Sequence, residues 1–243
     1  MKILALDSSG LVATVAVIED AEMVAEYTIN YKKTHSQTLL PMIDEMAKMI
    51  ELDMTTIDAI AVAAGPGSFT GLRIGSATAK GLGLALGKPL IAIPTIEGLA
   101  YNLYGTQSLI CPLMDARRNQ VYTGAYYFQG ARLVALKEQC AEDIEETITF
   151  LNNEQRPVIF LGDGVPVYQE IISMKMQNEY SFAPPHLSRQ RAGALGALGI
   201  SYYKDGKIQS ATEHRPEYLR MSQAEREQAE KEKVNANSKA NGS

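Results

Sequence analysis

Tryptophan is absent from this sequence and cysteine is scarce: 243 residues contain only Cys111 and Cys140. The two cysteines form no C-x-x-C pair, which argues against a zinc site or a disulfide framework and is typical of a reduced, cytosolic protein. No apolar run reaches the length of a transmembrane helix, and the N-terminus lacks the charged-then-apolar pattern of a signal peptide. We therefore expect a cytoplasmic protein with no membrane partner.

The chain is also short of positive charge. Its 23 Lys and Arg residues are outnumbered by 28 Asp and Glu residues, which gives a net charge of -5. This balance argues against a broad basic surface for nucleic acid. Apolar residues make up 46% of the chain, enough for a substantial core, and the length allows one large domain or two of ordinary size.

A glycine-rich loop between an apolar run and a long helix organises the first half of the chain. Residues 60–64 predict a buried strand that ends in the loop Gly65-Pro66-Gly67. Ser68 or Thr70 is expected to cap a helix that runs to about residue 86, where Gly87 ends it.

That helix carries small residues four apart, namely Gly71, Gly75, Ala79 and Gly83. Each interior glycine costs roughly 1 kcal/mol relative to alanine, so the stripe indicates close backbone approach to another element. Spacing alone leaves two interpretations open. The stripe packs tightly inside its own domain, or it contacts the helix of a partner.

Several residues near strand ends form a candidate phosphate site that is weak as a motif. A glycine loop before a helix can bind anions, but the Gly-Lys-Ser/Thr of a Walker loop is missing. An aspartate at the end of a first strand either caps its own turn or faces a metal bound to phosphate. The candidate residues are Asp7, Ser8, Gly65, Gly67, Ser68 and Asp115.

Element order predicts two similar lobes. Residues 3–6, 11–18 and 23–31 indicate three strands, and the following helix carries an apolar face with Leu39, Met42 and Met46. Residues 1–105 form the expected first lobe. A second lobe over 106–221 opens in the same way, with strands at 109–114, 121–128 and 133–137 and a helix at 141–151. Residues 222–243 are polar and charged and are expected to form a disordered tail.

The hairpin with a terminal aspartate and the repeated βββαβα order resemble the actin-like, sugar-kinase and chaperone-ATPase (ASKHA) superfamily, a two-lobed α/β fold. Longer segments resemble one family much more closely. These are GPGSFTGLRIG at 65–75, THSQTLLPMIDEM at 34–46, MDARRNQVYTGAY at 114–126 and FLGDGV at 160–165. Across residues 1 to about 220, the chain resembles the TsaB (YeaZ) family.

This resemblance implies a role in tRNA modification. TsaB is a paralogue of TsaD, which transfers threonylcarbamoyl to N6 of adenosine 37 in tRNAs that read ANN codons. TsaD carries a His-x-x-x-His metal pair, and the corresponding places here are Thr95 and Leu99. Two imidazole ligands four apart are therefore missing, and no metal is expected. The three histidines of the chain are scattered and cannot replace the pair by spacing.

By resemblance, the chain is a noncatalytic scaffold that dimerises with TsaD and activates it. TsaE joins the complex, TsaC supplies the threonylcarbamoyl-adenylate, and tRNA binds through the complex. No cofactor is expected, except that ATP or ADP could sit at the interface of the complex. The resemblance favours the partner interpretation of the small-residue stripe, with an interface of Leu39, Met42, Met46, Gly71, Leu72, Gly75, Ala79, Leu82 and Gly83.

Three alternatives stay open. A kinase or ATPase of the same superfamily would use the strand-end residues as a phosphate site, although the first turn reads Asp-Ser-Ser-Gly and not Asp-x-Gly-x-Thr/Ser. A peptidase would need the missing histidine pair or a nucleophile set, and such sets are assembled in space. A homodimer would use the same helix face on a second copy of the chain.

Overall fold

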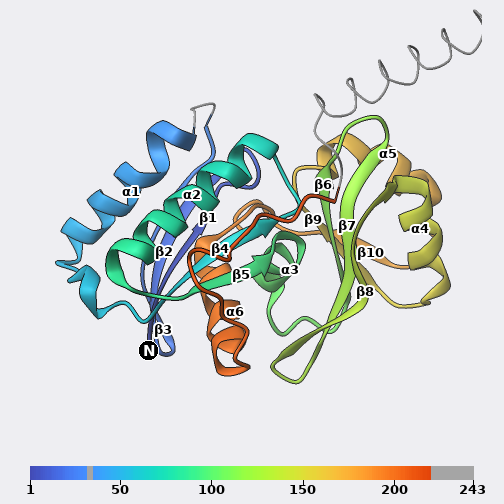
Figure 1. The fold of residues 1–243 in the computed structure, drawn as a ribbon. Coiled ribbons are helices and arrows are strands. Elements are labelled where there is room, and N and C mark those ends of the chain that lie inside the picture. Colours follow the sequence, from blue (N-terminus) through green and yellow to red (C-terminus); the bar gives the residue numbers. More distant parts are fainter. Residues whose placement is uncertain (32–34, 220–243) are drawn as a thin grey trace, which may run out of the picture.

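The computed structural model describes residues 1–31 and 35–219, so the expected tail at 222–243 lies outside the described residues. The first half of the chain builds a five-stranded sheet (Figure 1). Its strand order is β3-β2-β1-β4-β5, with β4 and β5 parallel to β1 and with β2 antiparallel to its neighbours. The strands are β1 (Lys2–Asp7), β2 (Ala13–Glu19), β3 (Glu22–Ile29), β4 (Ala59–Gly65) and β5 (Leu90–Pro94).

The second sheet repeats this order. It runs β10-β9-β6-β7-β8, so the first strand of each sheet lies between an antiparallel second strand and a parallel fourth strand. The strands are β6 (Leu109–Asp115), β7 (Gln120–Gln129), β8 (Arg132–Asp143), β9 (Val158–Leu161) and β10 (Tyr180–Phe182). The predicted pair of βββαβα lobes is confirmed. In each half of the chain a further strand and helix follow in sequence, β5 and α3 in the first and β10 and α6 in the second.

Helices cover the sheets on both faces (Figure 1). Two long helices lie on the outer face of the first sheet, and two shorter ones cover its other face. They are α1 (His35–Met49), α2 (Phe69–Leu86), α3 (Thr95–Ala100) and α6 (Ala192–Lys204). The outer face of the second sheet packs against α4 (Ile144–Asn153) and α5 (Val165–Lys175). Short 3-10 turns lie at Met54–Thr56 and Tyr101–Leu103. Within the described ranges, no helix has both the length and the apolar character needed to cross a membrane.

The central strand β1 shows why its sequence is apolar without interruption. Leu4 and Leu6 pack on the side of α1 and α2, whereas Ile3 and Ala5 pack on the side of α6. Successive side chains of a strand point to opposite faces, so a strand covered on both faces needs apolar residues at every position.

The ends of α2 follow the predicted capping. The Ser68 side chain accepts a hydrogen bond from the backbone N–H of Gly71 at 3.3 Å, and Gly87 adopts the left-handed conformation with φ of 64°. A serine at the N-cap supplies an acceptor to an otherwise unpaired N–H, and glycine enters the left-handed region without a Cβ clash.

Other boundaries differ from the prediction. The third strand of the second lobe runs to Asp143 instead of ending at residue 137, and α4 begins at Ile144. The Asp143 carboxylate accepts the N–H of Glu145 at 2.8 Å, which makes Asp143 the N-cap. The acidic residues before it continue the edge strand, although their composition resembles a first helical turn. The three-residue strand β10 was not predicted.

The C-terminal part of the described chain returns to the first lobe. Helix α6 packs against β1 and β2 through Ala192, Leu195 and Leu198, although residues 106–221 were predicted to form the second lobe. Further along, Gln209 and Leu90 exchange two backbone hydrogen bonds of 2.9 Å. The two lobes are therefore connected by the chain twice, before β6 and after β10.

His214 lies at the centre of this returning segment. Its side chain is fully buried, and Nδ1 lies 2.8 Å from Nε2 of Gln209. The His214 carbonyl oxygen accepts a hydrogen bond from Nζ of Lys80 at 3.3 Å. Burial lowers the pKa of His214 from its usual 6.5, and the charges of Lys80 and Arg215 lower it further.

We predict that acid destabilises the protein through His214. As the pH falls below 6.5, the unfolded chain takes up a proton at this site while the folded chain does not, so stability is lost. The loss should approach about 1.4 kcal/mol per pH unit between the two pKa values. His214→Gln should remove this component, and His186→Gln, at an exposed site, should not. Denaturant unfolding from pH 7.5 down to pH 5 measures both, and identical pH dependence of the wild type and His214→Gln would contradict the assignment.

Candidate functional site

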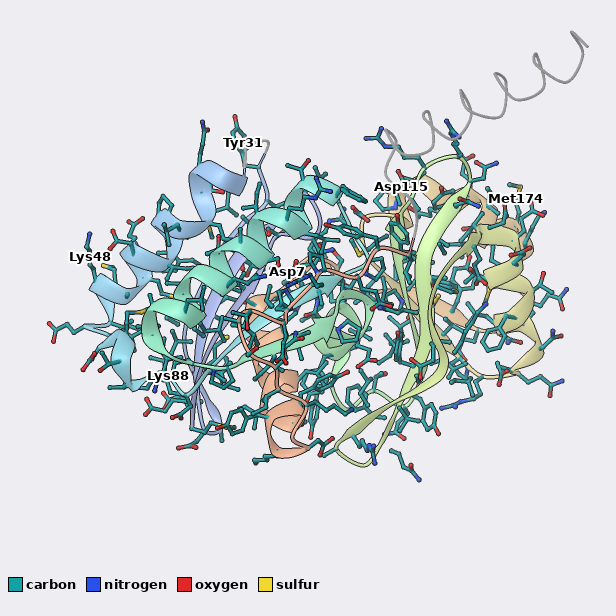
Figure 2. All side chains as sticks on the ribbon, in the orientation of Figure 1. Asp7, Tyr31, Lys48, Lys88, Asp115 and Met174 are labelled. Carbon is teal, nitrogen blue, oxygen red and sulfur yellow. The ribbon has the colours of Figure 1, made fainter. Side chains whose placement is uncertain are left out.

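The first strand of the first lobe ends in a turn that its own aspartate holds. Asp7 is buried at the end of β1, and its Oδ1 accepts the backbone N–H of Ser9 at 2.7 Å. Figure 2 shows Asp7 in the middle of the molecule, between the outer helices of the first lobe and the second lobe. This hydrogen bond supports the interpretation that Asp7 caps its own turn.

This turn packs directly against the glycine loop and the start of α2. The backbone N–H of Ser68 donates to the carbonyl oxygen of Ser9 at 2.6 Å, and the Ser8 hydroxyl donates to the carbonyl oxygen of Gly71 at 2.9 Å. A Cβ atom at Gly67 would overlap the Ser9 carbonyl oxygen, and one at Gly71 would overlap the Ser8 carbonyl oxygen. Glycine is thus required at both positions, because the Ser8 and Ser9 backbone occupies the space that a side chain would need.

The end of β4 is covered as well. Gly65 has φ of 120°, and an added Cβ would overlap the carbonyl oxygen of Glu217. The backbone N–H of Glu217 donates to the Ala64 carbonyl oxygen at 2.6 Å. Tyr218 stacks on Phe69 with ring centroids 4.0 Å apart. The C-terminal segment therefore lies across the loop that was the candidate phosphate site.

The corresponding turn of the second lobe has a different set of contacts. Oδ1 of Asp115 accepts the N–H of Arg117 at 2.8 Å and the hydroxyl of Tyr168 at 3.1 Å. The Asp115 N–H donates to Oδ1 of Asp163 at 3.1 Å. Burial and the charge of Asp115 raise the pKa of Tyr168 to about 12, so the phenol remains a donor. Burial also raises the pKa of Asp163. Asp115 is engaged within its own lobe.

Gln190 fills the interval between the two turns. It is buried, its Nε2 lies 3.6 Å from the sulfur of Met114 at the end of β6, and the same atom lies 3.0 Å from where a Cβ of Gly10 would stand. The structure thus brings the turns after β1 and β6 to opposite sides of one amide side chain. Sequence reasoning missed Gln190 because no motif surrounds it.

The two residues at the places of the TsaD histidine pair have structural roles. The Thr95 hydroxyl accepts the backbone N–H of Gly65 at 3.1 Å, and Leu99 is buried between the lobes. Neither side chain binds a metal as an imidazole does, so these residues do not fit the metal of TsaD. Over residues 1–31 and 35–219, no group of three or more His, Cys, Asp or Glu residues is placed to hold a metal ion.

The predicted partner interface requires correction, because its residues face the chain's own sheet. Gly75 lies against the Ser8 hydroxyl, and Gly83 lies against Leu90 and Ala211. Only Leu82 is half-buried, whereas the other members are buried in the first lobe: Leu39, Met42, Met46, Gly71, Leu72, Gly75, Ala79 and Gly83. Periodicity identified one face of each helix, and that face is the inner one.

The outer face of the same helices has different residues. Leu84 in α2 is 62% exposed, and Leu40 and Met49 in α1 are also exposed. Gly81 lies in the interior of α2, and a Cβ added there would meet no atom within 4 Å. Among residues 1–31 and 35–219, nothing requires glycine at this position. Sequence inspection had one signal for it: Gly81 is a glycine of α2 that lies outside the four-residue stripe.

Strand order and site together define a class of protein. The duplicated sheets, each with an aspartate at the end of its first strand, form a two-lobed protein of the actin-like, sugar-kinase and chaperone-ATPase class. Component A of the (R)-2-hydroxyglutaryl-CoA dehydratase of Acidaminococcus fermentans shares the fold, with a TM-score of 0.50 at 11% identity over 85% of this chain and all of that chain.

Closer relatives identify the family. The tRNA threonylcarbamoyladenosine biosynthesis protein TsaB of Bacillus subtilis is 31% identical over 96% of this chain and 100% of that protein. TsaB of Haemophilus influenzae is 28% identical over 90% of this chain and 94% of that protein. A family model described as TsaD, tRNA N6-adenosine threonylcarbamoyltransferase, matches residues 22–228. The structure of YeaZ from Pseudomonas aeruginosa superposes with a TM-score of 0.75 at 25% identity over 90% of this chain and 99% of that chain. The chain belongs to the TsaB (YeaZ) family.

Two glycines of α2 should respond oppositely to alanine. Gly71→Ala should destabilise the fold by several kcal/mol, because the new methyl group overlaps the Ser8 backbone. Gly81→Ala should stabilise it by up to about 1 kcal/mol, because alanine is the better helix former and the site is open. Urea unfolding of the two variants measures the difference, and a destabilised Gly81→Ala would show that Gly81 has an intramolecular role.

Proposed function

We propose that this chain acts in the biosynthesis of tRNA threonylcarbamoyladenosine as a noncatalytic subunit that binds TsaD and activates it. The names of the Bacillus subtilis and Haemophilus influenzae relatives support the pathway. The matching family description, a tRNA N6-adenosine threonylcarbamoyltransferase, supports common ancestry with the catalytic subunit.

The observation that carries the noncatalytic assignment is the packing at the turn after β1. In this position, Ser8 and Ser9 bind the start of α2 directly through the 2.6 Å and 2.9 Å hydrogen bonds. Thr95 and Leu99 support the same conclusion, because one holds the glycine loop and the other lies in the core. The residues that a catalytic relative would direct at a metal and a phosphate hold the fold together in this chain.

The binding surface for TsaD is the outer face of α1 and α2. Leu84 offers apolar area on α2, and Leu40 and Met49 offer it on opposite flanks of α1, because residues nine apart in a helix lie about half a turn from each other. Burial of such side chains drives most protein association. Gly81 leaves the backbone of α2 uncovered, so a partner helix can approach closely. This surface lies on the same two helices as the predicted interface, on the opposite side of each.

The further components follow from this role. TsaE joins the pair of TsaB-type and TsaD subunits, TsaC supplies threonylcarbamoyl-adenylate, and tRNA binds through the complex. ATP or ADP binds only at the interface of the complex, because the chain fills its own strand-end turns. In the absence of TsaD, the same outer face would join two copies of this chain.

Leu84→Glu should abolish pairing, because a carboxylate in the centre of an apolar contact must be desolvated without a partner. Met174→Glu in α5 is the control, since Met174 is 73% exposed and lies in the second lobe at the far end of the molecule (Figure 2). We expect binding to the cognate TsaD to weaken at least about tenfold in Leu84→Glu only. Size-exclusion chromatography with light scattering measures the complex, and threonylcarbamoyl transfer to tRNA with TsaC and TsaE present measures activation.

The same experiment separates the alternatives. Equal co-elution of both variants with TsaD would reject this face. Transfer that proceeds fully without the chain would reject the activating role. Steady ATP turnover by the chain alone would favour a kinase- or ATPase-like enzyme in its place. A dimer of the chain alone that Leu84→Glu dissociates would confirm that self-association uses the same surface.

A further inference from the structure

A cavity of about 680 Å³ lies on the side of the molecule away from α1 and α2. Its walls come from both lobes: α3 and α6 of the first, and the β7–β8 hairpin of the second. In Figure 1, α6 and the end of this hairpin lie at the lower edge of the molecule, with α3 between them. The cavity is separate from the strand-end turns and from the outer helix face.

The inner end of the cavity is rich in hydrogen-bonding oxygen atoms. The Tyr202 hydroxyl donates to Oε2 of Glu97 at 2.6 Å. Burial raises the pKa of Glu97, while the Tyr202 hydrogen bond opposes that shift. The carboxyl group of Glu97 is thus held at a fixed position at the junction of the lobes.

Tyr126 also lines the inner end, and its hydroxyl group has no hydrogen-bond partner within residues 1–31 and 35–219. The residue is fully buried, and its ring lies over Gly124, where a Cβ would stand 2.8 Å from the hydroxyl oxygen. Buried tyrosine hydroxyls usually find a partner, so an unpaired one beside a cavity indicates a bound group. Burial raises the pKa of Tyr126, and the negative charges of Glu97 and Glu138 raise it further.

The outer part of the cavity carries charges of both signs. Arg132, Lys204 and Lys207 line it, together with the acidic residues Glu138 and Asp205. Nζ of Lys207 lies 4.4 Å from the centre of the Tyr202 ring, which places this ammonium group beside the inner tyrosine. The inner end offers a carboxylate and a phenol oxygen, and the rim offers three basic side chains beside two acidic ones, which can accommodate a molecule with a positive group at one end and a negative group at the other.

We propose that this cavity binds a free α-amino acid. Its ammonium group donates to the Glu97 carboxylate and the Tyr126 hydroxyl oxygen, and its carboxylate lies toward Lys207 and the other basic residues of the rim. The faces of Tyr101, Tyr126 and Tyr202 suit an ammonium group, because aromatic rings attract cations. The inference uses only the residues of the cavity and does not depend on pairing with TsaD.

Isothermal titration of the full-length chain with L-threonine, glycine and the other standard amino acids tests the proposal. Two further probes test the charged groups of the amino acid separately: ethanolamine carries only an ammonium group, and propionate carries only a carboxylate. We expect saturable binding of at least one amino acid. Ethanolamine and propionate should each bind at least about tenfold more weakly than that amino acid.

Tyr126→Phe and Glu97→Gln should each weaken that binding at least about tenfold. Tyr127→Phe is the matched control, because Tyr127 is the next residue of β7 and packs on the opposite face of the sheet. Removal of an unpaired hydroxyl should leave the melting temperature of Tyr126→Phe unchanged or raised, which excludes misfolding as the cause. Absence of saturable binding, equal affinity in Tyr126→Phe, or ethanolamine binding as tightly as the amino acid would each overturn the proposal.

Discussion

The close approach of α2 to the turn after β1 determines much of this structure. Two backbone segments lie within hydrogen-bond distance, with Ser68 donating to Ser9 at 2.6 Å and Ser8 donating to Gly71 at 2.9 Å. Only glycine at 67 and 71 permits this separation. The contact fixes how α2 is rotated about its axis, because the small-residue side must face the sheet. The side with Gly81 and Leu84 then has to face solvent or a partner. One packing constraint therefore holds the turn after β1 against α2 and sets which side of α2 is the outer surface.

The duplicated lobes use equivalent positions in different ways. A glycine with positive φ stands at the end of each fourth strand: Gly65 is the last residue of β4, and Gly162 directly follows β9. A Cβ at Gly162 would overlap the Leu113 carbonyl oxygen of the neighbouring first strand, whereas one at Gly65 would overlap Glu217. In the second lobe the glycine allows close packing against a strand of the same lobe. In the first lobe it receives the returning C-terminal segment, which explains why the first lobe is more fully covered at its strand ends.

The sequence predicted the order of elements along the chain, the Gly87 cap, Ser68 as one of two candidate caps, and the repeat of the lobes, because these depend on local residue types and on periodicity. It did not predict what covers each helix face. The stripe from Gly71 to Gly83 indicates that the helix makes a close contact. The residues that it contacts, such as Ser8 and Leu90, are distant in sequence and cannot be identified from the stripe. The cavity residues were missed for the same reason. Glu97, Tyr126 and Tyr202 come from three elements with no shared motif, and only the packing of α6 on the first lobe brings them together.

The first sheet lies between the two proposed binding surfaces, which are the outer face of α1 and α2 and the cavity beside α6. On one face, Gly75 of α2 lies 3.7 Å from Leu6 and 3.9 Å from Val62, measured from an added Cβ. On the other face, Gly199 of α6 lies 3.2 Å from Ala61 by the same measure. Helices α2 and α6 each place a glycine against the sheet, one on each face of β1 and β4. Because close-packed interiors transmit displacement, neither helix can move unless the sheet or the opposite helix moves as well. A partner on α2 and a ligand against α6, as proposed, would therefore act on the same two strands from opposite faces. Because the cavity also takes a wall from the second lobe, α6 would then lie between the outer helix face and the junction of the lobes.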